Sequence, residues 1–180
     1  NSVLSQDFES FELLILDNCS TDSTALIVSD IQDNRIRYIK NDFNIGSISN
    51  FNKGIELSSG VYFLLLPHDD LLLPGSLGKF VYILEDSSIG FVYSATQFID
   101  ENSEELTTKV NHTENQLFKT EEAIKDVVDH FVPIQLAITR TDIIKSMIKF
   151  DIEYGSLCDV QFWLKIIFND WKTFYHSDPL

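Results

Sequence analysis

The sequence predicts an α/β fold in which helices flank a mostly parallel central sheet, with a smaller α+β lobe after it. Over the first two-thirds of the chain, short apolar runs alternate with segments of helical period, which is typical of parallel α/β sheets. Several of these runs are continuously apolar, as strands buried on both faces are. The regular alternation ends near residue 120. We therefore expect one domain with two lobes, formed by residues 1–100 and 101–180.

The first lobe is predicted to alternate strands with helices. Residues 11–16 form a nearly continuous apolar run, and residues 61–66 form the most hydrophobic run of the chain. Residues 44–57 place their apolar side chains at helical spacing. The other elements expected here are helices at residues 20–33 and 74–84 and strands at residues 36–40 and 89–99.

The second lobe has a less regular order. Residues 100–119 are polar and have little periodicity, which favours a long loop or an irregular hairpin. Residues 155–158 are expected to form a loop before the last helix. The remaining elements predicted are helices at residues 124–131, 141–149 and 160–167 and short strands at residues 134–139 and 172–175.

Composition and charge limit the classes of partner. A chain of 180 residues with 44% hydrophobic residues can bury a core of its own. Its formal net charge of −15 argues against nucleic acid and against an anionic membrane surface, because both need a basic face. An anionic nucleotide remains possible, since a divalent cation can bridge carboxylates to phosphates. No apolar run predicts a transmembrane segment, and Cys19 and Cys158 are interpreted as small, partly buried apolar residues.

Acidic residues follow two of the predicted strands at their carboxyl ends. Asp17 and Asn18 end the first strand, and Asp69 and Asp70 follow the strand at residues 61–66. Ligands of open parallel sheets collect at this edge. Adjacent carboxylates repel each other, and Mg²⁺ or Mn²⁺ would relieve that repulsion. The alternative is that the acidic pair only begins a solvated turn before the next helix.

Several motifs resemble those of family 2 glycosyltransferases. Residues 14–24 resemble the family's strand-D-D-G-S-x-D-x-T segment, and residues 41–55 are similar to its N-x-x-N-x-G … N-x-G-I stretch. Residues 58–62 resemble its A-x-G-x-Y sequence, and Leu-Pro-His-Asp-Asp at residues 66–70 looks like its L-D-x-D-D motif. These matches keep the family's order and spacing over residues 2–100. The resemblance implies a GT-A fold, which is Rossmann-like.

The resemblance also implies a role for each matching residue. Asp17 and Asn18 would line the pocket for the base and ribose of a nucleotide sugar, and Asp70 would hold Mn²⁺ or Mg²⁺ against the diphosphate. Residues 1–100 would form the nucleotide-sugar-binding lobe and residues 101–180 the acceptor-side lobe. The substrate-binding positions implied in the first lobe are Asp17, Asn18, Asp22, Asn44, Gly46 and Asp69.

A shorter and looser match lies in the second lobe. Residues 156–165 resemble the family's E-D-x-x-x-W-x-R segment. Asp159 would then be the general base, while Trp163 and Lys165 would be an aromatic and a basic residue beside the substrate. The residues themselves leave alternatives open. Asp159 also suits the N-cap of the following helix, and the helical spacing of Trp163 suits a core residue.

The implied reaction is an inverting sugar transfer. The donor would be a nucleoside diphosphate sugar, a UDP-sugar above all, and the acceptor a hydroxyl of a glycan or glycolipid. The acceptor hydroxyl attacks the anomeric carbon while the nucleoside diphosphate leaves from the opposite face. A general base typically contributes about 10²–10⁴-fold to the rate. Such a protein is expected in the cytoplasm, peripheral to the inner membrane.

Three departures from the family pattern matter. Pro67 stands where many relatives have the first Asp of D-x-D-D, so a metal would rely on Asp69, Asp70, phosphates and water. Asn18 replaces the second Asp of the first acidic pair, and its amide donors leave the preference for uracil open. The family's first strand has no counterpart before Asn1. We therefore expect a truncated chain whose exposed sheet favours association, for example as a homo-oligomer.

Two other functions remain as alternatives. A non-catalytic GT-A-like domain would keep the fold and bind carbohydrate or a partner protein. Asp159 discriminates between the two readings, because a pure binder needs no base there. A different doubly wound nucleotide-binding domain, such as a nucleotidyltransferase, is the other alternative. The sequence contains no G-x-G-x-x-G or G-x-x-x-x-G-K-S/T loop, which disfavours dinucleotide-binding and P-loop proteins.

Overall fold

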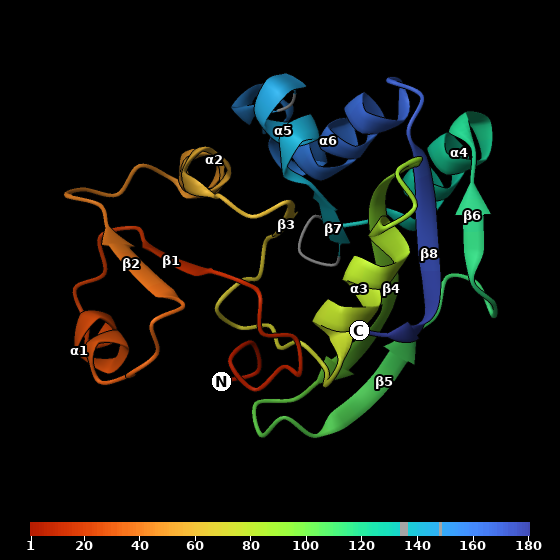
Figure 1. The fold of residues 1–180 in the computed structure, drawn as a ribbon. Coiled ribbons are helices and arrows are strands. Elements are labelled where there is room, and N and C mark those ends of the chain that lie inside the picture. Colours follow the sequence, from red (N-terminus) through yellow and green to blue (C-terminus); the bar gives the residue numbers. More distant parts are fainter. Residues whose placement is uncertain (134–136, 148) are drawn as a thin grey trace.

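The computed structural model describes residues 1–133, 137–147 and 149–180 and contains two sheets (Figure 1). The smaller sheet pairs β1 (Leu13–Asp17) with β2 (Ile36–Lys40). The larger, six-stranded sheet has the order β3-β7-β4-β8-β6, and β5 pairs with β4. Its strands are β3 (Tyr62–Leu64), β4 (Ile89–Ile99), β5 (Glu105–Lys109), β6 (Gln116–Phe118), β7 (Ala137–Arg140) and β8 (Lys172–Pro179).

Strand pairing is mixed, which corrects the expectation of a mostly parallel sheet. The pairs β1–β2 and β4–β8 are parallel. The pairs β3–β7, β4–β5, β4–β7 and β6–β8 are antiparallel. A short connection such as residues 100–104 permits only an antiparallel pair, because a parallel pair needs a long crossover. The sequence showed β3 and β4 as apolar runs but did not show that β7, from the second half, lies between them.

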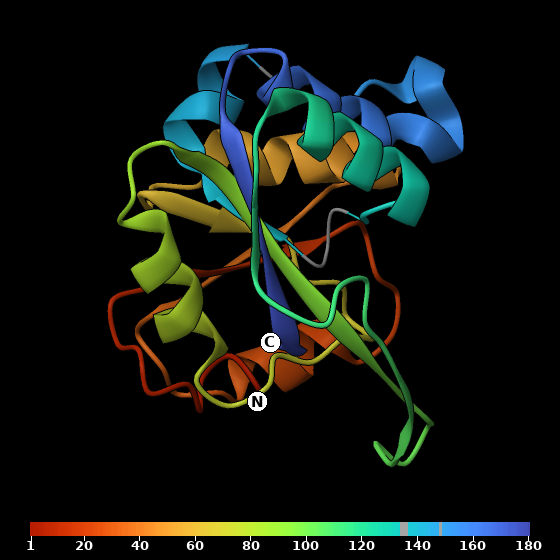
Figure 2. The ribbon, with the colours of Figure 1, turned by 90° about the vertical axis from the view of Figure 1, so that its right-hand side faces the viewer.

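Helices cover both faces of the six-stranded sheet. Alternation along β4 places Phe91 and Tyr93 in one apolar cluster and Val92 in another. The first cluster includes residues of α4 (Thr120–His130), α5 (Thr141–Met147) and α6 (Cys158–Ile167), and the second includes residues of α3 (Ser76–Leu84). Figure 2 shows α4, α5 and α6 gathered in one layer, with α3 elsewhere on the sheet. This arrangement confirms the α/β class with a central sheet flanked by helices.

The helices of the N-terminal part are shorter than predicted. Helix α1 spans Thr24–Ser29 and has no buried residue, so packing does not extend it to residue 33. Helix α2 spans Ser47–Leu57 rather than residues 44–57. Its N-cap is Gly46 with φ of 82°, a backbone conformation that glycine adopts without steric cost. That glycine sets the start of α2 and leaves Asn44 in the preceding loop.

Most predicted elements of the second half occur, with shifted limits. Residues 100–119 contain β5, which forms an irregular hairpin with β4, and β6, which pairs with β8 instead. The expected loop at residues 155–158 is instead the 3₁₀ helix η2 (Ile152–Leu157), followed directly by α6. Residues 134–136 of a predicted strand and residue 148 of a predicted helix lie outside the described residues. Among the described residues, no helix has the length and hydrophobicity needed to cross a membrane.

Candidate functional site

Asp17 ends β1 and is fully enclosed. The residue is 4% exposed, and its carboxylate accepts hydrogen bonds from the Ser20 N–H at 2.6 Å and from the Tyr38 hydroxyl. The Lys40 ammonium lies 3.9 Å away. Burial alone would raise the pKa of Asp17, but these donors and the Lys40 charge lower it to about 2. The Asp17 carboxylate is therefore ionised at neutral pH and fixes the start of the loop after β1.

Tyr38 is the partner of Asp17 on β2. The hydrogen bond to the Asp17 carboxylate raises the pKa of Tyr38 to about 12, so its hydroxyl keeps its proton and acts as a donor. The two parallel strands place Ile15 opposite Tyr38, and the tyrosine ring reaches the end of β1 from there. Sequence analysis missed Tyr38, because the pairing of the strands decides which β2 side chain approaches Asp17.

Asn18 joins the loop after β1 to the loop after β2. Its Oδ1 accepts hydrogen bonds from Asn41 Nδ2 at 3.0 Å and from the Ile45 N–H at 2.9 Å. Its Nδ2 donates to Asn44 Oδ1 at 2.9 Å. The same Asn44 oxygen accepts from the Gly46 N–H at 2.9 Å. The structure thus brings Asn18, Asn44 and Gly46 together at the carboxyl ends of β1 and β2.

Further asparagines connect this loop pair to α2. Asn41 Nδ2 also donates to Asn50 Oδ1 at 2.9 Å, and Asn41 Oδ1 accepts from Lys53 Nζ at 2.6 Å. Asn50 Nδ2 donates to the Leu16 carbonyl at 3.3 Å. Sequence analysis assigned no role to Asn41, Asn50 or Lys53. Asn41 could have been predicted from its position. It directly follows β2, just as Asp17 and Asn18 stand at the end of β1. The two α2 residues lie three apart, on one helix face.

Asp22 acts at the start of α1. Its Oδ1 accepts hydrogen bonds from the Thr24 N–H at 2.9 Å and from the Thr24 hydroxyl at 2.5 Å. These two bonds lower the pKa of Asp22. The carboxylate therefore satisfies an otherwise unpaired donor in the first turn of α1, while the residue itself stays exposed.

Asp69 and Asp70 follow β3 in an exposed turn. Asp69 lies 3.7 Å from His68, measured from Oδ1 to Nδ1. Asp70 lines a cavity of about 190 Å³ together with the β4 residues Ser94, Thr96 and Gln97. Partial burial raises the pKa of Asp70, and the charge of Asp69 raises it further. A cation beside Asp70 would offset both effects, and the oxygen-bearing side chains of the cavity suit a hard ion.

Asp159 lies in the first turn of α6. The N-cap of this helix is Leu157, so the interpretation of Asp159 as the cap is wrong. The Cys158 thiol donates to Asp159 Oδ1 at 3.3 Å. Burial and this neighbouring carboxylate raise the pKa of the Cys158 thiol to about 11, so the thiol stays protonated. A carboxylate in the first turn of a helix also interacts favourably with the helix dipole.

Trp163 fills the core. Its ring is fully buried, stacks on Phe91 with 4.2 Å between ring centroids, and donates from Nε1 to the Val132 carbonyl at 3.0 Å. The core interpretation of Trp163 therefore holds in this structure, and the indole has no face open to a sugar.

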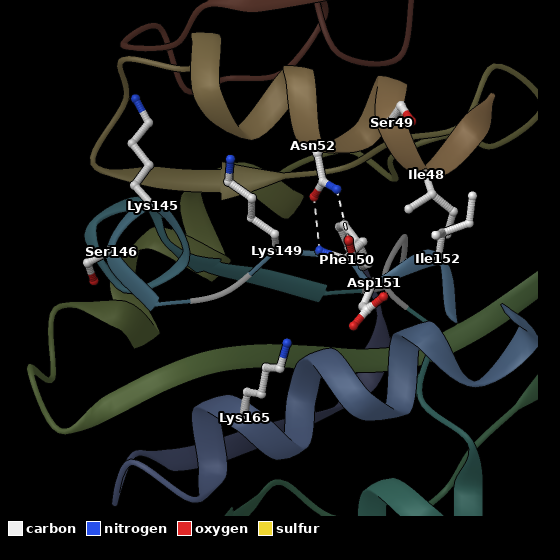
Figure 3. Close-up of a pocket in the computed structure, with 10 residues that line it drawn as sticks. All are labelled: Ile48, Ser49, Asn52, Lys145, Ser146, Lys149, Phe150, Asp151, Ile152 and Lys165. Carbon is white, nitrogen blue, oxygen red and sulfur yellow. Dashed lines mark hydrogen bonds between the residues drawn. The ribbon is translucent and has the colours of Figure 1, made fainter. Parts of the chain in front are cut away.

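Lys165 lines a second cavity, of about 570 Å³, whose lining contains other residues than those after β1. Figure 3 shows Lys145, Lys149 and Lys165 around it, with α2 along one side. Asn52 of α2 pairs with the Phe150 backbone through two hydrogen bonds of 2.9 Å. The predicted site residues thus fall into separate places: the loops after β1 and β2, the Asp70 cavity, the Lys165 cavity and the core.

The family of the chain follows from comparison with known proteins. The model of the family described as glycosyl transferase family 2 matches residues 1–147. The chain belongs to glycosyl transferase family 2. An uncharacterised glycosyltransferase of Methanocaldococcus jannaschii is 31% identical over 180 aligned residues, which cover 95% of this chain and 59% of that protein.

Another family 2 relative has a specific name. The Escherichia coli protein WfgD, named a UDP-Glc:α-D-GlcNAc-diphosphoundecaprenol β-1,3-glucosyltransferase, is 29% identical over 103 residues. That match covers 57% of this chain and 41% of WfgD. This family 2 chain therefore spans about half the length of the curated relatives that it matches.

Solved structures confirm the GT-A-type fold of this family 2 chain. Staphylococcus aureus TarS in complex with UDP superposes with a TM-score of 0.79 at 20% identity, over 98% of this chain and 52% of that one. A Pyrobaculum calidifontis mannosyltransferase in complex with GDP-Man and Mn²⁺ superposes with a TM-score of 0.68 at 15% identity, over 99% of this chain and 51% of that one. At these identities the likeness supports the fold alone.

Proposed function

We propose that this chain forms the nucleotide-sugar-binding part of an inverting glycosyltransferase, which transfers a sugar from a nucleoside diphosphate donor to a hydroxyl of a glycan or glycolipid. One observation carries the proposal. Asparagine side chains tie together the two loops at the carboxyl ends of the parallel strands β1 and β2, which is the edge where parallel sheets bind nucleotides.

The donor nucleotide would meet the outer side of these loops. Asn44 and Gly46 are exposed and Asn18 is half-buried, so these residues can contact a base and ribose. Asp17, whose side chain is covered, is a positioning residue that holds the Ser20 N–H and the Tyr38 hydroxyl. A UDP-sugar is the preferred donor, because WfgD is named for UDP-Glc and TarS has been solved with UDP and UDP-GlcNAc.

Asp70 is the residue that would hold Mn²⁺ or Mg²⁺, with Asp69 beside it. The chemistry of the donor set fits, since carboxylate oxygens are ligands that both ions accept and Asp70 carries a raised pKa that a cation would reverse. Pro67 supplies no ligand. When bound, such an ion supplies positive charge beside the diphosphate of the donor.

Asp159 is proposed as the general base. Its carboxylate would accept the proton of the acceptor hydroxyl as the new glycosidic bond forms and the bond to the nucleoside diphosphate breaks. The resemblance of residues 156–165 to the family's acidic motif supports this role. Lys165, one turn and a half further along α6, is proposed to face the acceptor side. A lipid-linked acceptor, as in the name of WfgD, would place the protein in the cytoplasm at the periphery of the inner membrane.

Calorimetric titration with UDP, GDP and dTDP, each with and without Mn²⁺, tests the donor site. We expect one nucleotide to bind in a Mn²⁺-dependent way and expect Asp70→Ala to abolish that binding. The matched control is Asp30→Ala, because Asp30 is an exposed acid that follows α1. Nucleotide binding that is unchanged in Asp70→Ala would contradict the metal assignment, and equal affinity for all three would contradict a preference for uracil.

A non-catalytic sugar-binding domain is the second candidate. The family motifs have aspartate where this chain has Asn18 and Pro67, and this loss of acidic residues favours it. Transfer assays with Asp159→Asn separate the two functions. An enzyme should lose turnover by roughly 10²–10⁴-fold while nucleotide affinity is kept, whereas a pure binder should show no turnover before or after the substitution.

A further inference from the structure

Three potential metal ligands lie together on α4 and the segment before β6. Asp126 and His130 are four residues apart, so they share one face of α4. His112 reaches them from the segment between β5 and β6. The ligand atoms of these three residues all lie within 4.8 Å of one another. In Figure 1, α4 lies at the upper right, away from the loop at residues 65–75 that carries the proposed donor-site acids.

Asp126 is the unusual member of this cluster. Its side chain is 4% exposed, and its Oδ1 contacts both His112 Nε2 and, at 2.9 Å, His130 Nδ1. Its other oxygen, Oδ2, is buried and has no hydrogen-bond partner among the described residues. A buried polar atom that lacks a partner is costly, and a bound cation would supply one.

The surrounding residues hold His112 in place. Its ring lies 5.3 Å from the ring of Phe118 and 5.1 Å from that of Tyr175, between centroids. The Asn111 N–H donates to the Tyr175 hydroxyl at 2.9 Å, which attaches this segment to β8. The His112 and His130 side chains remain 28% and 29% exposed. The cluster is therefore preformed on the protein side and open to solvent on the other.

We propose that His112, Asp126 and His130 form a binding site for a transition-metal ion, Zn²⁺ above all, with water as a further ligand. Two imidazoles and one carboxylate are a donor set that suits Zn²⁺ and disfavours Mg²⁺ and Ca²⁺, which prefer oxygen ligands. The site is separate from the donor site and does not depend on the proposed sugar transfer. The ion would connect the segment before β6 to α4.

Both imidazoles have to move away from Asp126 Oδ1 to accept the ion. Ligands of a tetrahedral zinc ion lie roughly 3.3 Å apart, given bonds of about 2.0–2.1 Å. The His130 Nδ1 to Asp126 Oδ1 distance is now 2.9 Å, so this pair has to separate by a few tenths of an ångström, and the shorter His112 Nε2 to Asp126 Oδ1 contact has to open further.

Zinc titration against a chromophoric chelator tests the site on the full chain. We expect one equivalent of Zn²⁺ to bind. Loss of a residue that only hydrogen-bonds to a metal ligand weakens metal binding by up to about 100-fold. His112→Gln and His130→Gln each remove a proposed ligand itself, so each should weaken Zn²⁺ binding by at least about 100-fold. Two controls should bind Zn²⁺ as the parent does. Asp70→Ala removes the proposed donor-site ligand, and His176→Gln removes a histidine outside the cluster.

Cobalt substitution gives a readout that does not require a variant. Co²⁺ held by two imidazoles and a carboxylate in a tetrahedral site absorbs strongly in the visible range, while Co²⁺ in an octahedral all-oxygen site absorbs weakly. A strong visible band that Zn²⁺ displaces supports the proposal. A weak spectrum, no Zn²⁺ binding at micromolar concentration, or binding that is lost in Asp70→Ala but kept in both histidine variants would overturn it.

Discussion

An apolar strand of the smaller sheet, β1, and one of the larger sheet, β4, differ in how deeply they are buried. β1 has five residues, and the four apolar ones that begin it are only half-buried. β4 begins with seven buried residues. Within the described residues β1 pairs only with β2, whereas β4 pairs with β5, β7 and β8 and has apolar clusters on both faces. Hydrophobicity along a strand therefore indicates a sheet, but the number of neighbours in the fold decides how much of that surface is buried.

The two regions also differ in whether their enclosed polar side chains have hydrogen-bond partners. Around β1, the enclosed Asp17 and the asparagines after it have hydrogen-bond partners from β2, the following loop and α2. Around the six-stranded sheet, Asp126 is enclosed with one oxygen unpaired. The first arrangement is a completed network, and the second retains the capacity to take a ligand.

The largest expected difference concerns leucine truncation. Leu84→Ala should destabilise the protein by about 2–5 kcal/mol, because Leu84 is fully buried against the six-stranded sheet. Leu14→Ala should cost markedly less, since Leu14 in β1 is only half-buried. Urea unfolding of both variants measures the two costs. Equal costs would mean that the β1 surface is covered in solution, and the comparison would fail.

A smaller contrast is expected from two glycines. A Cβ on Gly90 would lie 2.6 Å from Cβ of Trp171 and 2.8 Å from Cγ2 of Ile166, so Gly90→Ala should cost about 1–3 kcal/mol through overpacking. On Gly54 of α2, a Cβ would meet only the Leu16 Cδ1 at 3.0 Å.

Gly54→Ala should therefore be nearly neutral, because the tip of Leu16 can move and alanine favours a helix by up to about 1 kcal/mol. Thermal unfolding of both glycine variants checks this contrast. A large loss in Gly54→Ala would show that β1 and α2 pack as rigidly as the six-stranded sheet.

A third contrast depends on pH and reports on the region around β1. The pKa of Asp17 in the folded protein is about 2, below its ordinary value of 3.8. The ionised carboxylate therefore stabilises the fold at every pH above the pKa that Asp17 has in the unfolded chain. That contribution should disappear as the pH falls from about 4 to about 2. Asp17→Asn should be less stable than the parent at pH 6 and should lose less stability over this range.

Urea midpoints measured between pH 6 and pH 2 follow the Asp17 effect. Asp30→Asn is the control. Asp30 is exposed, and among the described residues its carboxylate has no hydrogen bonds like the two that Asp17 accepts from Ser20 and Tyr38. We expect its acid profile to match that of the parent. An acid profile of Asp17→Asn that also matches the parent would contradict the stabilising role of the ionised carboxylate.

Sequence reasoning located part of the candidate site. Asp17, Asn18, Asn44 and Gly46 were predicted together from strand ends and motif spacing, and hydrogen bonds join Asn18 to Asn44 and Asn44 to Gly46. Tyr38 was missed because its role depends on the pairing of two strands. Trp163 was placed among substrate-side residues by motif position, while the packing of α6 on β4 buries it.

The local amino-acid sequence by itself determined the limits of β2 and β4, the positions of α3 and α4, and the polar residues that end β1. These features depend on periodicity, propensity and spacing between near neighbours. The tertiary structure alone decided that β7 lies between β3 and β4, that β4 is buried more deeply than β1, and that His112 meets Asp126 and His130. The physical reason is that strand partners and buried ligand clusters arise from contacts between residues far apart in the sequence, which no local pattern specifies.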